Sequence, residues 1–222
     1  MSVRFPGSDV QITGGELALR GYLHVPLNAA GLVLFAHGSG SSRHSSRNQF
    51  VAKRLATSNI ATLLLDLLTS EEERVDEQTG ALRFDISLLA QRLMMATDWC
   101  NGQQAIRQLP RGYFGASTGA AAALIAAAER ATIVQAVVSR GGRPDLAGPA
   151  LSRVHCPVLF IVGGYDEEVL HLNRQAAERL TGKHQMLVIP KAGHLFEEPG
   201  ALQQVADAAA QWFSGSLDPA AP

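Results

Sequence analysis

The chain has 222 residues, of which 46% are hydrophobic and 18% charged, which is the composition of a folded domain and excludes a wholly disordered chain. Its formal net charge of -1 gives no broad field for attracting nucleic acid or an anionic membrane. No stretch approaches the roughly 20 apolar residues of a membrane span. We expect one domain over residues 1–214 with a small-molecule partner, no nucleic acid and no membrane.

Two further features concern the compartment. The first residues carry no apolar run of the length that a signal peptide needs, so a cytoplasmic location is expected. Cys100 and Cys156 cannot form a disulfide framework, and both are expected to be buried thiols.

The predicted strands are short apolar segments separated by helical stretches. Residues 10–17 and 18–25 are expected to pair antiparallel, with a turn near Gly14-Gly15 or Gly21. Further strands are predicted at residues 32–36, 61–66, 112–115, 133–139, 158–162 and 186–189. These runs are too apolar to have one face in water, which favours a mostly parallel sheet with helices on both faces.

Helical patterns lie between and after these strands. One begins with Asp85 as its cap and ends at Cys100, and the last follows Pro199-Gly200. The charged segment 67–84 is interpreted as a long loop, either solvated or folded over something. Residues 215–222 are expected to form a flexible tail.

The motif Gly115-Ala116-Ser117-Thr118-Gly119 fits G-x-S-x-G between a predicted strand and a predicted helix. A sharp turn there would force the serine to positive φ and expose its Oγ above the sheet. The alternative is an ordinary serine that caps the helix, with glycines for the turn. The strand and helix context favours Ser117 as a nucleophile.

A serine nucleophile requires a histidine base and usually a carboxylate that orients the histidine. His194 follows the strand 186–189 and Asp166 follows the strand 158–162, so both lie at the sheet edge that carries Ser117. The chain order Ser, Asp, His is that of an α/β-hydrolase. Asp66 and Asp145 are alternative acids at the same edge.

An oxyanion hole needs two backbone amides near the attacked carbonyl. We assign one to Thr118 and the other to Ser39, in the loop His37-Gly38-Ser39-Gly40 after the strand 32–36. A phosphate cradle is a weaker interpretation of this loop, because the glycine pattern fails at Arg43. His37 is expected to hold the loop by hydrogen bonds. No metal is predicted, since His37 and His44 have no third ligand at a familiar spacing.

These motifs together resemble the α/β-hydrolase family, close to the dienelactone hydrolase-like esterases. The resemblance covers residues 31–213 through His37-Gly38, the Ser117 motif, Gly164-Tyr165-Asp166 and Gly193-His194. It implies an α/β-hydrolase fold and ester hydrolysis without a cofactor. Dienelactone hydrolase proper has a cysteine where this chain has Ser117, so the dienelactone substrate itself does not follow. The family often inserts a cap after its sixth strand, but residues 141–156 leave no room for a large one.

Without a cap, the site is expected to be open and to bind small esters or lactones. The candidate substrate-binding residues are Gly40, Arg43, His44 and Arg140. The arginines favour an ester that bears a carboxylate or phosphate; alternatively, they pair structurally with Asp66, Asp85 or Asp145.

The predicted function is a serine hydrolase that cleaves small carboxylic esters or lactones through an acyl-enzyme. One alternative is a binding protein of the same fold with a silent triad. Another is an acyltransferase or perhydrolase that uses the same site with a different acceptor. The oligomeric state is left open.

Overall fold

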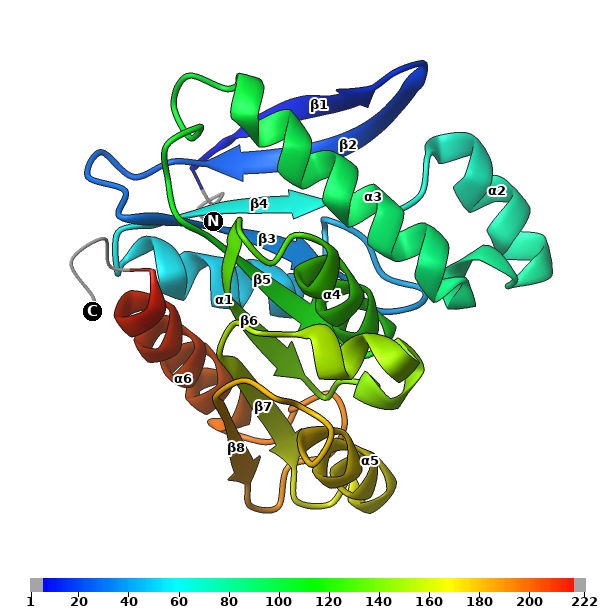
Figure 1. Ribbon diagram of the computed structural model, residues 1–222, viewed down its shortest axis with the longest axis vertical. Helices are drawn as coiled ribbons and strands as arrows, with labels where there is room; N and C mark the ends of the chain where they lie inside the picture. The colour runs from blue at the N-terminus through cyan, green and yellow to red at the C-terminus, as the bar shows by residue number, and fades with distance from the viewer. Residues whose placement is uncertain (1–5, 218–222) are drawn as a thin grey trace.

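The computed structural model describes residues 6–217, which form an eight-stranded sheet with helices on both of its faces (Figure 1). The strands are β1 (Ser8–Gly14), β2 (Leu17–His24), β3 (Gly31–Ala36), β4 (Ile60–Leu65), β5 (Arg111–Ala116), β6 (Val134–Arg140), β7 (Val158–Gly163) and β8 (His184–Ile189). The α-helices are α1 (Ser46–Ala56), α2 (Ser70–Thr79), α3 (Ile86–Trp99), α4 (Thr118–Glu129), α5 (Glu167–Ala177) and α6 (Ala201–Ser216). Short 3-10 helices are η1 (Leu82–Phe84), η2 (Cys100–Gly102) and η3 (Pro144–Arg153). Within residues 6–217, no helix combines the length and apolar composition needed to cross a membrane.

The strand order is β1-β2-β4-β3-β5-β6-β7-β8. β2 pairs antiparallel with both β1 and β4, and every other neighbouring pair is parallel. The fold is therefore the mostly parallel α/β-hydrolase sheet that the sequence predicts. The first hairpin turns at Gly15-Glu16, so of the two turns considered, the one near Gly14-Gly15 is confirmed.

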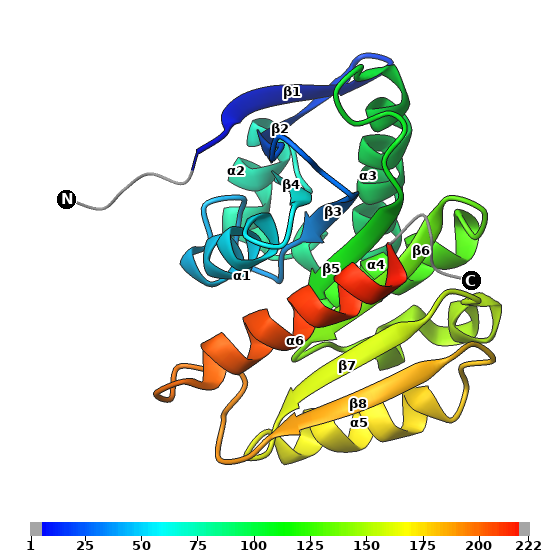
Figure 2. The same cartoon turned by 90° about the vertical axis from the view of Figure 1, so that its left-hand side faces the viewer.

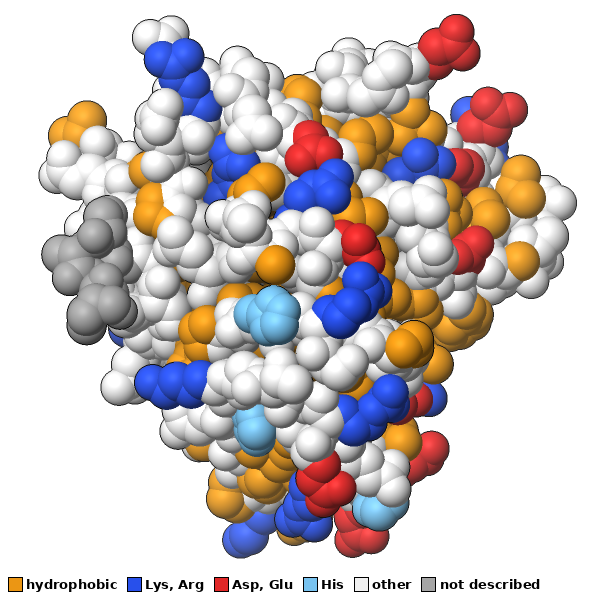
Figure 3. Space-filling view, in the orientation of Figure 1, with side chains coloured by type: hydrophobic (Ala, Val, Ile, Leu, Met, Phe, Trp, Pro, Cys, Tyr) orange, Lys and Arg blue, Asp and Glu red, His pale blue; other side chains and the backbone are white. Residues whose placement is uncertain are grey.

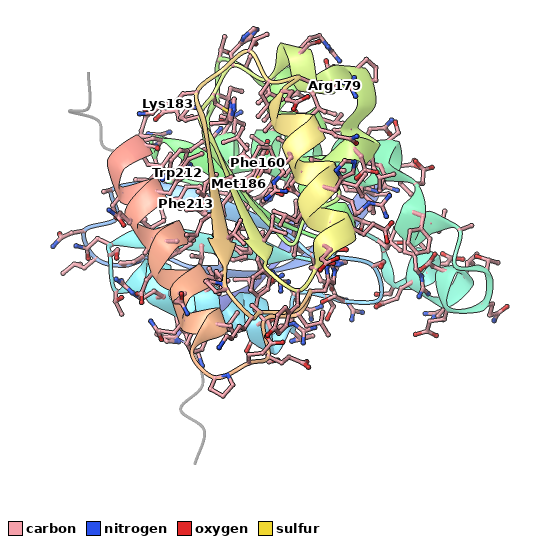
Figure 4. The ribbon with its side chains drawn as sticks, turned by 90° about the horizontal axis from the view of Figure 1, so that it is seen from below. Phe160, Arg179, Lys183, Met186, Trp212 and Phe213 are labelled. Carbon is pink, nitrogen blue, oxygen red and sulfur yellow. The ribbon has the colours of Figure 1, made fainter. Side chains whose placement is uncertain are left out.

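Two hydrophobic layers cover the sheet because the central strands are buried on both faces. Helices α1 and α6 lie on one face, and α3, α4 and α5 on the other (Figures 1 and 2). Figure 4 shows Trp212 and Phe213 on α6, on one side of the sheet. Phe160 and Met186, from β7 and β8, belong to the core on the opposite face.

The predicted loop over residues 67–84 is wrong, because this segment contains α2 and η1. The helix begins with a capping box. The Thr69 hydroxyl accepts a hydrogen bond from the Glu72 amide at 3.1 Å, and the Glu72 carboxylate accepts one from the Thr69 amide at 2.8 Å. Gly80 ends the helix in the left-handed conformation. In Figure 1, α2 lies at the edge toward which β3 and β4 point.

Two other predictions concern the chain between β6 and β7 and the end of the chain. Residues 141–156 contain η3 and no large cap, as predicted. The expected tail from residue 215 starts too early, because α6 continues to Ser216 and Leu217 is buried against Gly31. Residues 218–222 lie outside the described residues.

Candidate active site

Ser117 occupies a strained turn between β5 and α4. Its backbone has φ 51° and ψ -120°, a conformation that is costly for a residue with a Cβ. Its amide donates to the Arg140 carbonyl at 3.2 Å, and its carbonyl accepts from the Arg143 amide at 3.1 Å. These two bonds hold the turn at the carboxyl end of β5, with Ser117 at the sheet edge.

Close backbone packing shapes this turn. A Cβ on Gly119 would lie 2.3 Å from the Ala36 carbonyl oxygen and 2.5 Å from that of His37, so only glycine fits against the end of β3. Most α4 residues are buried and small, which lets the helix lie close to the sheet. The start of α4 is thereby set directly beside the loop that follows β3.

His194 and Asp166 are joined at the same edge. Nδ1 of His194 lies 2.6 Å from Oδ2 of Asp166, and since an ionised carboxylate can only accept, Nδ1 carries the hydrogen. The loop after β8 reaches this position because Gly163 has no Cβ, which would lie 2.4 Å from the Ala192 carbonyl oxygen. Nε2 of His194 is left to accept a proton.

Ser117 and His194 border the same stretch of backbone, Arg140-Gly141. Ser117 bonds to Arg140, and a Cβ built on Gly141 would lie 3.5 Å from Cε1 of the His194 ring. Within residues 6–217, no hydrogen bond joins Ser117 Oγ to His194. The structure thus brings the two residues to one region and pairs His194 with Asp166 alone.

The alternative acids Asp66 and Asp145 have other partners. Asp66 accepts hydrogen bonds from the amide and guanidinium of Arg43. Asp145 accepts two from the guanidinium of Arg143, at 2.9 and 2.8 Å. Neither bonds to His194 in the described part of the chain.

The loop after β3 approaches Ser117 from the other side. A Cβ on Gly38 would lie 3.0 Å from Cβ of Ser117. Ser39 is exposed, and its amide donates to none of the described residues. Thr118 is the first residue of α4, where amides have no partner within the helix.

His37 holds this loop, as the sequence predicts. Its Nε2 accepts from the Leu67 amide at 3.1 Å and its Nδ1 lies 2.9 Å from the Gly38 carbonyl oxygen, so Nδ1 carries the hydrogen. Burial lowers the pKa of His37 and outweighs the opposing effects of the Gly38 hydrogen bond and the Asp66 and Glu73 charges. A neutral imidazole that bridges two backbone groups has a structural role.

A cavity of about 250 Å³ lies between the loop that follows β3 and α2. It is lined by His37, Gly38, Ser39, Gly40, Ser41, Asp66, Leu68, Glu73, Asp76, Glu77, Arg83 and Leu89. Sequence reasoning missed the contribution of α2, although the Thr69-x-x-Glu72 capping signal could have shown that a helix begins there.

Asp76 organises the α2 side of this cavity. It is 4% exposed and accepts hydrogen bonds from the Leu82 amide and from the amide and guanidinium of Arg83. Burial alone would raise the pKa of Asp76, but these bonds outweigh burial and lower it from its ordinary value of 3.8.

The four candidate substrate-binding residues have different environments. Gly40 lines the cavity, while His44 is an exposed side chain. Arg43 pairs with Asp66, which is the structural alternative considered for it. Arg140 pairs with no acid among the described residues and is 7% exposed.

The two cysteines lack the environment of a reactive thiol. Both thiols are buried, and burial raises the pKa to about 12 for Cys100 and about 11 for Cys156. Within residues 6–217, no group of three or more His, Cys, Asp and Glu side chains is arranged to hold a metal.

A larger groove, about 980 Å³, lies at the opposite edge of the sheet between the starts of β6, β7 and β8 and the end of α6. Lys183 and Trp212 line it and are labelled in Figure 4. Burial raises the pKa of Cys156, which lines this groove, so its thiol is not activated as a nucleophile. Figure 3 shows Lys and Arg interspersed with Asp and Glu on one face, with no large field of one sign.

Comparison with solved structures identifies the family. A dienelactone hydrolase from Anabaena variabilis is 56% identical to the chain, with a TM-score of 0.94 over 96% of this chain and 98% of that one. The chain belongs to the dienelactone hydrolase family. Est1E from Butyrivibrio proteoclasticus is 14% identical to the chain, with a TM-score of 0.77. The match covers 92% of this chain and 97% of Est1E, and it shows the shared fold alone.

A third solved structure also shares the fold. It is a dienelactone hydrolase-like promiscuous phosphotriesterase from metagenomic libraries, 19% identical over 95% of this chain and 98% of its own, with a TM-score of 0.76. At this identity, the likeness shows the shared fold alone. No family model matches the chain.

The curated relatives are longer proteins. Two Mycobacterium tuberculosis proteins are 55% identical to the chain over 209 residues. These residues are 94% of this chain and 46% of each relative. The chain therefore spans about half of each. Both are named, provisionally, as phosphoribosyl transferases. Each relative is about twice as long as this chain, so the name does not say whether that activity belongs to the half that matches.

Proposed function

We propose that this chain is a serine hydrolase that cleaves small carboxylic esters or lactones. The observation that carries the proposal is the 2.6 Å bond between His194 and Asp166 at the edge where Ser117 stands at positive φ. A histidine oriented by a carboxylate beside a strained serine is the arrangement that activates a hydroxyl for attack on a carbonyl.

In the proposed reaction, Ser117 Oγ attacks the ester carbonyl while Nε2 of His194 takes its proton. The new oxyanion accepts hydrogen bonds from the amides of Thr118 and Ser39. His194 then gives the proton to the leaving alcohol, and an acyl-enzyme on Ser117 remains. Water, deprotonated by His194, attacks the acyl carbon and releases the acid.

Asp166 holds the imidazole in the tautomer that leaves Nε2 free, and its negative charge stabilises the imidazolium that forms. Catalytic hydrogen bonds often tighten only when substrate is bound, so the bond between Ser117 and His194 is assigned to the substrate complex. The mechanism requires no metal and no organic cofactor.

Small substrates are favoured by the shape of the site. The cavity that Ser39 lines, which does not include Ser117, Asp166 or His194 in its lining, measures about 250 Å³, below the roughly 300–1,000 Å³ of sites for drug-sized ligands. With no large cap after β6, little apolar wall is available for a long acyl chain. Short acyl esters and lactones fit these dimensions.

The Ser117→Ala variant tests the proposal with a panel of 4-nitrophenyl esters and lactones. We expect kcat to fall by on the order of 10³-fold or more, because the nucleophile is removed while the fold persists. Ser39→Ala is the matched control, since it keeps the amide and removes only a hydroxyl, and it should retain turnover. Activity retained in Ser117→Ala would overturn the proposal, and product analysis with added alcohol tests transfer to another acceptor.

A further inference from the structure

The loop between β3 and α1, residues 37–45, carries an amide of the proposed oxyanion hole but contains no helix or strand. Within it, the Ser41 amide donates to the Gly38 carbonyl at 3.2 Å, and Gly40 has a positive φ of 67°. An irregular loop is usually more mobile than the elements that it connects. An oxyanion hole, in contrast, needs its donors within about 0.5 Å of their working positions. Contacts from outside the loop are therefore needed to fix the Ser39 amide.

Both ends of this loop are bonded to two successive residues that follow β4. Near the start of the loop, Nε2 of His37 accepts from the Leu67 amide at 3.1 Å. Near its end, the Arg43 amide donates to Oδ1 of Asp66 at 2.8 Å, and the Arg43 guanidinium donates to Oδ2. Ser39 lies between these two points of attachment, so they limit how far its amide can move.

The backbone of Asp66 is fixed by the sheet. Asp66 follows the last residue of β4, a strand that lies between β2 and β3 and is buried along its whole length. Its amide donates to the Arg20 carbonyl of β2 at 2.9 Å, and the residue is 8% exposed. A loop bonded to such a residue takes its position from the sheet.

The ion pair between Asp66 and Arg43 is largely shielded from water. The two side chains are 12% and 14% exposed, and Nε of Arg43 lies 4.0 Å from Oδ1 of Asp9 on β1. Removing one member of a buried pair leaves the other charge without compensation, which is strongly unfavourable. Loss of the Asp66 carboxylate would therefore free both the guanidinium and the backbone amide of Arg43.

Other interpretations of Asp66 fit the contacts less well. Asp76 also accepts from the amide and guanidinium of one arginine, Arg83, but that pair joins α2 to η1. In the described part of the chain, Asp66 forms no bond to His194, so it does not orient that imidazole. Among residues 6–217, Asp66 is the carboxylate that accepts hydrogen bonds from the loop 37–45.

We propose that Asp66 is a positioning residue for the oxyanion hole, because it fixes the loop that brings the Ser39 amide to the carbonyl attacked by Ser117. This inference rests on the proposed function. Gly38 lies close beside Ser117, since a Cβ built on it would be 3.0 Å from Cβ of Ser117. A shift of the loop would thus move the amide of the next residue away from the oxyanion. Asp66 acts on the rate through the backbone of Arg43 and does not touch the reacting atoms.

Steady-state kinetics of Asp66→Ala with 4-nitrophenyl acetate tests this role. We expect kcat to fall by on the order of 10²-fold, the effect of losing one oxyanion donor, while KM changes by less than about threefold. Trifluoroacetone gives a second measurement as an inhibitor. Its carbonyl carbon bonds to Oγ of Ser117, the Oγ proton passes to His194, and the carbonyl oxygen becomes an oxyanion. Its inhibition constant should rise by about the factor by which kcat falls.

Further variants separate positioning from a general loss of stability. Asp66→Asn keeps an oxygen that can accept from the Arg43 amide, so its kcat should fall by no more than about tenfold. Tyr113→Phe removes a buried hydrogen bond to Thr97 in the hydrophobic core and should lower stability without changing kcat. An unchanged kcat in Asp66→Ala, or a rise in KM alone, would overturn the proposal.

The pH profile distinguishes positioning of the loop from orientation of the histidine. The acidic limb of kcat/KM reports the titration of His194 in the free enzyme, and it should be the same in Asp66→Ala as in the native chain. A shifted limb would assign Asp66 to the histidine and overturn the proposal.

Hydrogen exchange of the Ser41 amide, followed by NMR, does not depend on turnover. This amide bonds to Gly38 within the loop and not to Asp66, so its exchange reports the mobility of the loop. It should exchange about tenfold or more faster in Asp66→Ala than in the native chain, and at the native rate in Tyr113→Phe. Faster exchange in a chain that cleaves no ester would support the attachment of the loop and place the failure in the proposed function. Unchanged exchange in Asp66→Ala would contradict the attachment itself.

Discussion

The candidate catalytic edge, which carries Ser117, Asp166 and His194, and the α2 segment are held in place by different forces. Around Ser117, Gly119 and Gly163 allow backbone contacts that a single Cβ would break. Over residues 69–84, a capping box and the ion pair between Asp76 and Arg83 hold a helix with several exposed residues. Changes at the first region should affect catalysis and packing, and changes at the second should make stability depend on pH.

Asp166→Asn is expected to have the largest effect, a loss of turnover, because it changes the hydrogen bond to His194 at the candidate catalytic edge. An amide can donate to Nδ1 and stabilise the wrong tautomer of His194, so kcat should fall by on the order of 10³- to 10⁴-fold with little change in melting temperature. Asp145→Asn is the matched control, because Asp145 pairs with Arg143 instead. An equal loss in both variants would argue against a specific role for Asp166.

Gly119→Ala would disrupt the backbone packing of the same region. The added Cβ would meet two backbone carbonyl oxygens at 2.3 and 2.5 Å, and backbone cannot move aside cheaply. We expect the free energy of unfolding to fall by about 1–3 kcal/mol or more, measured by urea denaturation. Gly215→Ala, in α6 with no atom near its Cβ, should be neutral or stabilising. A stable Gly119→Ala variant would contradict the packing account.

Asp76→Asn tests the α2 segment and should have the smallest effect. It replaces charge-assisted hydrogen bonds with neutral ones, which should lower the free energy of unfolding by about 1–3 kcal/mol at pH 7. Glu77→Gln, which removes a charge from an exposed neighbour, should leave that free energy nearly unchanged.

The pH dependence of this difference gives a second measurement. The pKa of Asp76 is lower in the folded chain than its ordinary value of 3.8, so its stabilisation is fully present above about that pH. The stabilisation is lost as pH falls through the lowered folded-state pKa. The gap between the native chain and Asp76→Asn should therefore narrow below pH 3.8, and a constant gap would contradict the assignment.

The sequence predicted the positions of Ser117, Asp166 and His194 better than it predicted the α2 segment, for a physical reason. Central strands buried on both faces leave long apolar runs, and the carboxyl ends of parallel strands meet at one edge. That rule places Ser117, Asp166 and His194 at the same edge before any distance is known.

The remaining features depend on contacts between residues far apart in the chain. The burial of Leu217 follows from its fit against Gly31, which no periodicity records. That Arg140 has no acidic partner among the described residues follows only from the positions of the surrounding carboxylates in the fold. In α2, the density of charge suggested a loop, while the local signal in Thr69 and Glu72 favoured a helix.

Labelling with a fluorophosphonate, followed by mass spectrometry of the digested protein, tests the central claim most directly. Such a probe reacts with a serine only when a base and an oxyanion hole activate it. The account predicts a single modified peptide that contains Ser117, and no labelling of Ser117→Ala. A native chain that is not labelled, or that is labelled only at another serine, would contradict it.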